Sequence, residues 1–177
     1  MWRLAAIAAL VSCPAIALAQ DNAAQSNASA PIVGTGGKAA GTVDFTDTPN
    51  GVLIVATFEP GALPAGEHAI HVHEKGDCSD TAKFETAGGH YNPAGAEHGY
   101  MPEAGPHAGD MPNFVAVDGQ PAKVSLFNDM VRFKDGEAPL FDADGSALVV
   151  HANPDDYESQ PSGNAGDRIA CAELKGE

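Results

Sequence analysis

Short apolar runs, each ended by a turn, are the feature that most restricts how this chain can fold. Residues 42–46 alternate between polar and apolar side chains, residues 48–51 read Thr-Pro-Asn-Gly, and residues 52–58 are rich in branched side chains. Further runs occupy residues 69–73, 114–117, 123–127, 147–150 and 168–173. The chain contains 20 glycines and 13 prolines and shows no helical period. These features predict an all-β fold, an antiparallel sandwich or barrel.

Two long segments interrupt this rhythm. Residues 78–113 and residues 152–167 carry no strand or helix pattern. Loops of that length in a compact domain are usually functional or disordered. Because both contain side chains that something other than a hydrophobic core could order, we expect two long functional loops.

The N-terminus has the pattern of a targeting segment. Arg3 precedes an apolar stretch at residues 4–11, and the Ala-Leu-Ala sequence at residues 17–19 matches a small-residue cleavage site. The apolar stretch is too short to span a membrane. An alternative is a lipoprotein site at residues 10–13, with Cys13 as the lipidated residue.

Cleavage would divide the chain into a signal peptide over residues 1–19, a disordered tether over residues 20–30, and one domain over residues 31–177. The exported chain would keep two cysteines, Cys78 and Cys171, which most simply form one disulfide. In the chain-entropy model, closing a loop of about 90 residues contributes about 4–5 kcal/mol.

The formal net charge of −15 excludes some partners. Nucleic acids and anionic membranes are bound by basic surfaces, so we expect neither as a partner. If the substrate is an anion, a local positive field must overcome the charge of the whole chain.

His71 and His73 lie two positions apart in the run at residues 69–73. Side chains alternate along a strand, so both imidazoles point to one face while Ile70 and Val72 point to the other. One face can then bind a metal while the opposite face packs a core. The pair alone is equally compatible with two neutral surface histidines.

His151 follows the run at residues 147–150, directly before the second loop. If that strand lies near His71 and His73, three imidazoles and one from the first loop would suit copper, which favours nitrogen ligands. His68 points to the other face of its strand, and we interpret it as structural.

The first loop contains three histidines and an aspartate at spacings of eight, nine and three. They are His90, His98, His107 and Asp110. Three imidazoles and one carboxylate predict a tetrahedral zinc site, and four protein ligands make it a structural one. The alternative is a set of solvated loop histidines.

These histidines belong to motifs that follow one another in order along the chain. They are His71-Val72-His73, Gly76-Asp77-Cys78, Gly89-His90-Tyr91-Asn92-Pro93, His98-Gly99, Gly105-Pro106-His107-Ala108-Gly109-Asp110, Val150-His151 and Gly163-Asn164-Ala165-Gly166-Asp167-Arg168-Ile169-Ala170-Cys171. From about residue 40 to its end, the chain resembles the copper/zinc superoxide dismutases, most of all their exported bacterial branch.

The resemblance implies a Greek-key antiparallel β-barrel or sandwich of about eight strands, with one copper and one zinc per subunit. The implied copper ligands are His71, His73, His90 and His151, and the implied zinc ligands are His90, His98, His107 and Asp110. His90 would bridge both metals through its two ring nitrogens. Cys78 and Cys171 resemble the family's intrasubunit disulfide.

Two further residues gain a role from the resemblance. Asp155 resembles the carboxylate that links a copper ligand to a zinc ligand, although the adjacent Asp156 is an alternative. Arg168 resembles the arginine that guides the substrate, and a guanidinium offers the permanent positive charge that an acidic chain needs to attract an anion.

The implied reaction converts two superoxide radicals and two protons to dioxygen and hydrogen peroxide, with copper alternating between Cu(II) and Cu(I) and zinc in a structural role. His90 would leave copper on reduction and deliver a proton, so it would be catalytic together with Arg168. The resemblance also implies a periplasmic location and a monomer or homodimer. The alternatives are a non-catalytic copper/zinc carrier and an adhesive sandwich. Carriers and inactive relatives commonly lose a copper ligand or the arginine, all of which are present here, and an adhesive sandwich has no reason to keep the metal-spaced histidines and aspartate.

The chain departs from the family pattern in four places. Ala69-Ile70 stands where the family usually has Gly-Phe, and Ala172-Glu173-Leu174 follows Cys171 in place of Gly-Val-Ile. Residues 31–37 give only a weak signal for the family's first strand. The second loop contains no lysine, so we expect a weaker dependence of the rate on ionic strength than in a lysine-assisted enzyme.

Overall fold

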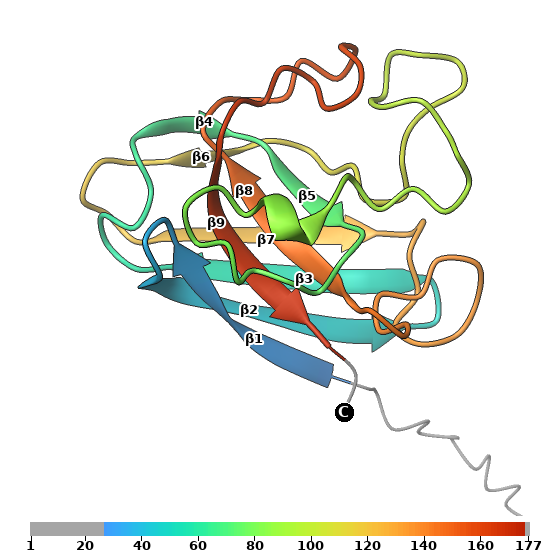
Figure 1. The fold of residues 1–177 in the computed structure, drawn as a ribbon, viewed down its shortest axis with the longest axis horizontal. Helices are drawn as coiled ribbons and strands as arrows, with labels where there is room; N and C mark the ends of the chain where they lie inside the picture. Colours follow the sequence, from blue (N-terminus) through green and yellow to red (C-terminus); the bar gives the residue numbers. More distant parts are fainter. Residues whose placement is uncertain (1–26, 176–177) are drawn as a thin grey trace, which may run out of the picture.

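The computed structural model describes residues 27–175, which form an antiparallel β-structure with almost no helix (Figure 1). Within these residues the elements are β1 Asn27–Gly34, β2 Lys38–Thr48, β3 Gly51–Phe58, β4 Gly66–His68, β5 Ile70–His73, the 3₁₀ helix η1 Glu85–Ala87, β6 Phe114–Ala116, β7 Ala122–Asn128, β8 Ser146–His151 and β9 Arg168–Leu174. The all-β prediction is therefore confirmed. No helix in the described part of the chain is long and apolar enough to cross a membrane.

Seven strands form one curled sheet in the order β5-β8-β9-β1-β2-β3-β7, and β4 pairs with β6 in a small second sheet. Every strand pair is antiparallel. Ala69 alone separates β4 from the edge strand β5, and a turn separates β6 from the other edge strand, β7. The small sheet therefore connects both edges of the large one, which gives the barrel-like form in Figure 1.

The first strand begins earlier than the sequence indicates. Residues 27–30, which we expected in the disordered tether, pair with residues 43–46 of β2. Ala28 and Ala30 alternate with exposed neighbours and pack against the core, in register with buried Ile32. This is a period of two, but alanine is too small to make the pattern conspicuous in the sequence. The expected signal peptide, the rest of the tether and Cys13 lie outside the described residues.

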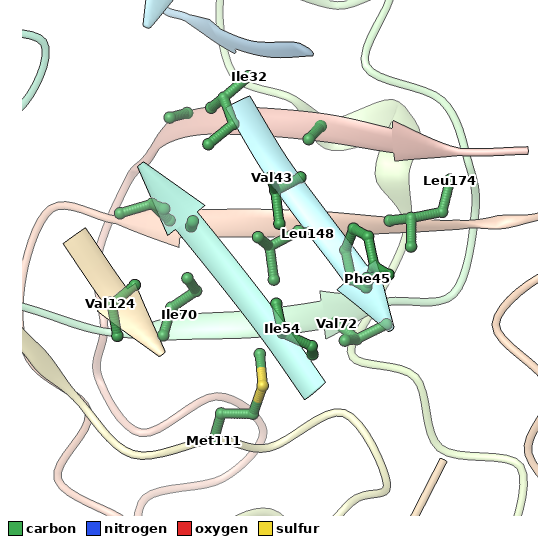
Figure 2. Close-up of a cluster of buried hydrophobic side chains, with 14 of the residues drawn as sticks. Ile32, Val43, Phe45, Ile54, Ile70, Val72, Met111, Val124, Leu148 and Leu174 are labelled. Atoms are coloured by element: carbon green, nitrogen blue, oxygen red, sulfur yellow. The ribbon is translucent and has the colours of Figure 1, made fainter. Parts of the chain in front are cut away.

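The core lies between the two halves of the curled sheet (Figure 2). Labelled members are Ile32, Val43, Phe45, Ile54, Ile70, Val72, Met111, Val124, Leu148 and Leu174. Along β5 the core receives Ile70 and Val72, as strand alternation predicts. His71 and His73 point to the opposite face, yet they are also fully buried because the long loops cover that face.

A smaller buried cluster fixes the first loop to the outer face of β8 and β9. It contains Cys78, Phe84, Ala87, Ala147, Val149 and Cys171. The predicted disulfide between Cys78 and Cys171 is present, with a Cα–Cα distance of 5.9 Å. The covalent link and the buried Phe84 ring thus attach the loop to the strand that carries Arg168.

Candidate metal centre

The pairing of β5 with β8 places three histidines together. His71 pairs directly with Val149, so their side chains share a face, and His151 is two residues beyond Val149 on β8. The ring centroids of His71 and His151 are 5.0 Å apart. The first loop returns beside β5 through a bridge between His73 and His90. One ring nitrogen from each of these four histidines lies within 4.8 Å of the others.

Each of these rings has one nitrogen engaged in the protein and another directed at the common centre. His73 Nδ1 donates to the Gly88 carbonyl at 3.0 Å, and His151 Nδ1 donates to the Gly166 carbonyl at 3.3 Å. Their Nε2 atoms lie only 3.4 Å apart. Among the described residues, the buried His71 Nδ1 and His90 Nε2 have no hydrogen-bond partner.

Unpartnered buried nitrogens are rare because they forfeit hydration without compensation. Burial also lowers the pKa of His71 to about 4, that of His151 to about 3, and that of His73 well below its usual value. These three rings are therefore neutral at neutral pH and can act as ligands. Four converging imidazole nitrogens fit copper.

The second group lies entirely within the first loop. Its members are His90, His98, His107 and Asp110, and their ligand atoms also lie within 4.8 Å of one another. Asp110 Oδ1 is 2.8 Å from His90 Nδ1 and 3.0 Å from His98 Nδ1. His107 Nδ1 is 3.4 Å from His90 Nδ1. Three nitrogens and one oxygen converge as a tetrahedral zinc site requires.

His90 faces both groups with different atoms. Its Nδ1 points to the loop-borne group (His90, His98, His107 and Asp110). Its Nε2, like His71 Nδ1, is an unpartnered nitrogen of the strand-borne group (His71, His73, His90 and His151). The ring centroid of His90 lies 4.1 Å from that of His71 and 5.4 Å from that of His107. This orientation agrees with the bridging role that the resemblance implies.

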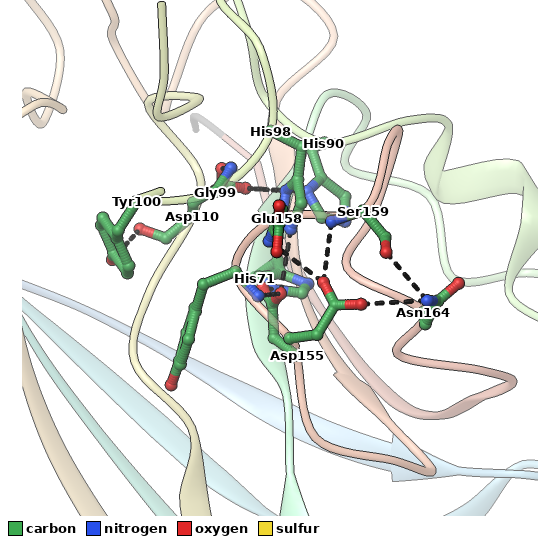
Figure 3. A network of polar contacts seen from close by, with 12 residues as sticks. His71, His90, His98, Gly99, Tyr100, Asp110, Asp155, Glu158, Ser159 and Asn164 are labelled. Carbon is green, nitrogen blue, oxygen red and sulfur yellow. Dashed lines mark hydrogen bonds and ion pairs between the residues drawn. The ribbon is translucent and has the colours of Figure 1, made fainter. Parts of the chain in front are cut away.

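Asp155 connects the two groups from the second loop (Figure 3). Its Oδ2 is 2.8 Å from His71 Nε2, and its Oδ1 is 3.0 Å from His98 Nε2. Burial raises the pKa of Asp155, but the bonds to His71 and His98 outweigh burial and keep the pKa below its usual value. Asp156 instead binds Ser159 and Asn164 at the surface. The linking position therefore belongs to Asp155.

Arg168 shares a hydrogen-bond acceptor with His73 of the strand-borne group. Its guanidinium donates to the carbonyls of Phe84 and Gly88, each at 2.7 Å, and Gly88 also accepts from His73. Gly88 has φ 75°, and a Cβ there would lie 2.5 Å from Glu74 Oε1. Glycine is thus required for this carbonyl to face both donors.

Sequence reasoning missed residues that support the site. Asn113 clamps the backbone of Asp155, because its Oδ1 accepts from the Asp155 N–H and its Nδ2 donates to the Asp155 carbonyl, both at 2.9 Å. Lys83 lines a cavity of about 510 Å³ together with Arg168. No local pattern marks either residue.

The ring nitrogens of His68 lie 2.9 Å from the carbonyls of Pro64 and His151, which agrees with its structural interpretation.

Comparisons with known proteins agree with this geometry. The family model "Copper/zinc superoxide dismutase (SODC)" matches residues 39–174. Superoxide dismutase [Cu-Zn] 2 of Aquifex aeolicus is 44% identical over 149 residues, covering 84% of this chain and 86% of that protein. Superoxide dismutase [Cu-Zn] of Caulobacter vibrioides is also 44% identical, over 84% of this chain and 86% of that protein.

Solved structures show the same likeness. A SOD-like protein from Bacillus subtilis superposes with a TM-score of 0.78 at 33% identity, covering 84% of this chain and 99% of that one. The Cu/Zn superoxide dismutase from Brucella abortus has a TM-score of 0.66 at 26% identity, covering 84% and 99%. The chain therefore belongs to the copper/zinc superoxide dismutase family, oxidoreductases whose two metals its histidine groups could bind.

Proposed function

We propose that this chain converts two superoxide anions and two protons to dioxygen and hydrogen peroxide. The observation that carries the proposal is the geometry of His90, which presents Nδ1 to one ligand group and its unpartnered Nε2 to the other. The four histidines of the strand-borne group would hold copper, and the loop-borne group would hold zinc. When bound, copper supplies the one-electron redox couple, whereas zinc has no redox chemistry.

The roles of the chain's own residues follow from their positions. Arg168 attracts the anion and orients it, because its guanidinium is permanently charged and is held by the same Gly88 carbonyl that accepts from His73. His90 Nε2 holds and releases a proton, because it has no protein partner while the other nitrogen of the same ring, Nδ1, is held by Asp110. Asp155 orients His71 and His98 and fixes which nitrogen of each ring stays free.

A non-catalytic metal carrier is the rival function. A carrier needs the ligands but has no use for a guanidinium held by two carbonyls beside an open cavity. Arg168 therefore separates the two functions experimentally.

The test is a superoxide-consumption assay with metal analysis on the wild-type protein, His73→Ala and Arg168→Ala. We expect His73→Ala to lose copper and activity while it retains zinc. Arg168→Ala should retain both metals and lose about tenfold or more in rate. Arg132→Ala is a matched control, because Arg132 also donates to two backbone carbonyls, those of Asp129 and Val131. Full activity in a copper-free His73→Ala protein would refute the proposal, and a fully metallated but inactive wild type would favour the carrier.

We further propose that the protein acts in the periplasm, where it removes superoxide. The targeting pattern of residues 1–19 supports this location, as does a disulfide, which persists in oxidising compartments. Cell fractionation of the full-length chain and of Cys13→Ser tests it. Equal release of both into the periplasmic fraction is expected, whereas membrane retention that depends on Cys13 would indicate a lipid anchor.

A further inference from the structure

Glu173 is a charged residue in the last strand, where the family pattern has an apolar one. Strand β9 does not end early to accommodate it, since pairing continues to Leu174. Ala172 and Leu174 face the core, so Glu173 points outward on the same face as Cys171. Its side chain is only 37% exposed, and its Oε1 accepts the backbone N–H of Cys78 at 2.7 Å.

Cys78 is therefore attached to β9 at two points. Its sulfur is bonded covalently to Cys171, and its N–H is bonded to Glu173 two residues further along the same strand. Lys175 Nζ lies 2.9 Å from Glu173 Oε2, which leaves Oε1 free for Cys78. Only the first of these two attachments can be broken by a reductant.

The segment that begins at Cys78 carries the carbonyls that hold Arg168. Phe84 and Gly88 supply them, and Gly88 also accepts from His73. The buried Phe84 ring and a bond from Gly36 N–H to the Thr81 carbonyl hold the middle of this segment. At Cys78 itself, the start of the segment is held by the disulfide and Glu173.

We propose that Glu173 is a positioning residue for Arg168, which anchors residues 78–88 to β9 in parallel with the disulfide and keeps them docked when the disulfide is reduced. A carboxylate acceptor gives a strong, charge-assisted hydrogen bond that no thiol chemistry affects. The effect on substrate guidance rests on the proposed function of Arg168, but the docking of the segment does not.

The experiment compares Glu173→Ala and Glu173→Gln on the wild-type background and on the Cys78→Ser/Cys171→Ser background. Glutamine is the matched control because it keeps an Oε1 acceptor. Amide hydrogen exchange over residues 79–88 is the first readout and requires no activity. With the disulfide present, both variants should exchange within about twofold of the parent. Without it, Glu173→Ala should exchange about tenfold faster than its parent, and Glu173→Gln should recover most of the protection.

Affinity of the copper- and zinc-loaded proteins for azide, a monoanionic probe, is the second readout. In the disulfide-free background, Glu173→Ala should weaken azide binding toward the level of Arg168→Ala, and Glu173→Gln should restore it. If the serine variants fail to fold, the same measurements are made on the Glu173 variants after chemical reduction of the disulfide.

Two results would overturn the proposal. One is equal exchange in Glu173→Ala and its parent without the disulfide. The other is an equally large loss in Glu173→Ala when the disulfide is intact, because parallel anchors must compensate for one another. If the wild-type loaded protein does not consume superoxide, the proposed function fails, while the exchange data still decide whether Glu173 anchors the segment.

Discussion

The strand-borne and loop-borne histidine groups share His90 but are constructed differently. In the strand-borne group, His71, His73 and His151 come from β5 and β8, whose opposite faces pack the barrel core. In the loop-borne group, all four residues lie between residues 90 and 110, a stretch without regular secondary structure apart from the bridge at His90.

This difference shows which interactions place the side chains of each group. Strand register places the first group, and that register is maintained by core burial whether or not a metal is present. The second group depends on Asp110, which bonds the His90 and His98 rings through Oδ1 and the N–H groups of Gly99 and His107 through Oδ2. The conformation of the loop therefore depends on the same residues that would bind the metal.

Removal of Asp110 should have the largest effect. In Asp110→Ala, we expect loss of zinc and a decrease of about 3–5 kcal/mol in the free energy of unfolding of the metal-free protein, because buried ring nitrogens and N–H groups lose their acceptor. Hydrogen exchange should rise in residues 91–110 far more than in β5. Zinc analysis, thermal unfolding and hydrogen exchange measure this, with exposed Asp156→Ala as the control. Retained zinc would show that the loop does not depend on Asp110.

The link between the groups is tested by Asp155→Asn. Both His71 Nε2 and His98 Nε2 donate to this carboxylate, and an amide can accept from only one of them. We expect the affinities for copper and zinc each to fall about 10–100-fold. Competition titrations with chelators measure both, with Asp156→Asn as the control. A loss confined to one metal would mean that the groups are independent.

Substitution in the cavity that Arg168 lines should have a smaller effect. Lys83 of the first loop supplies a cation that the second loop lacks, but Glu85, 3.7 Å away, lines the same cavity and offsets it. We therefore still expect the rate to depend weakly on ionic strength. Glu85→Gln should raise the rate about twofold at low salt and leave it unchanged at high salt.

The steady-state rate of superoxide consumption, measured over a series of salt concentrations, tests this effect. Glu59→Gln, which changes an exposed carboxylate outside this cavity, is the control. A steep decrease for the wild type would contradict the expectation. An increase in Glu85→Gln that persists at high salt would assign Glu85 a role other than electrostatic screening of Arg168.

The smallest effect is expected at Ala69. This residue is fully buried, its N–H bonds to Asn153 and its carbonyl accepts from His151, each at 2.9 Å. Ala69→Gly, which restores the usual family residue, should leave activity within about twofold and lower the free energy of unfolding by about 0.5–1 kcal/mol. Activity assays and thermal unfolding test this. A large gain in copper affinity would show that the methyl group crowds the histidines and that register alone does not place them.

Residues close together in the sequence could be interpreted without a structure. A period of two separates His71 and His73 from the core-facing Ile70 and Val72, and the structure shows that division. The two cysteines outside the expected signal peptide predicted the disulfide that is present. The first half of β1 was missed, because alternating alanines bury too little surface to give a clear apolar pattern.

The sequence by itself determined the fold class, the types of ligand and the family. Only the tertiary structure decided which ring nitrogen of His90 faces which group, that Asp155 and not Asp156 links them, and that Glu173 meets Cys78. The contacts of Asp155 and Glu173 join different loops or strands, between residues more than 50 positions apart. Local periodicity reports which face a side chain occupies, but the closing of the barrel decides what that face meets.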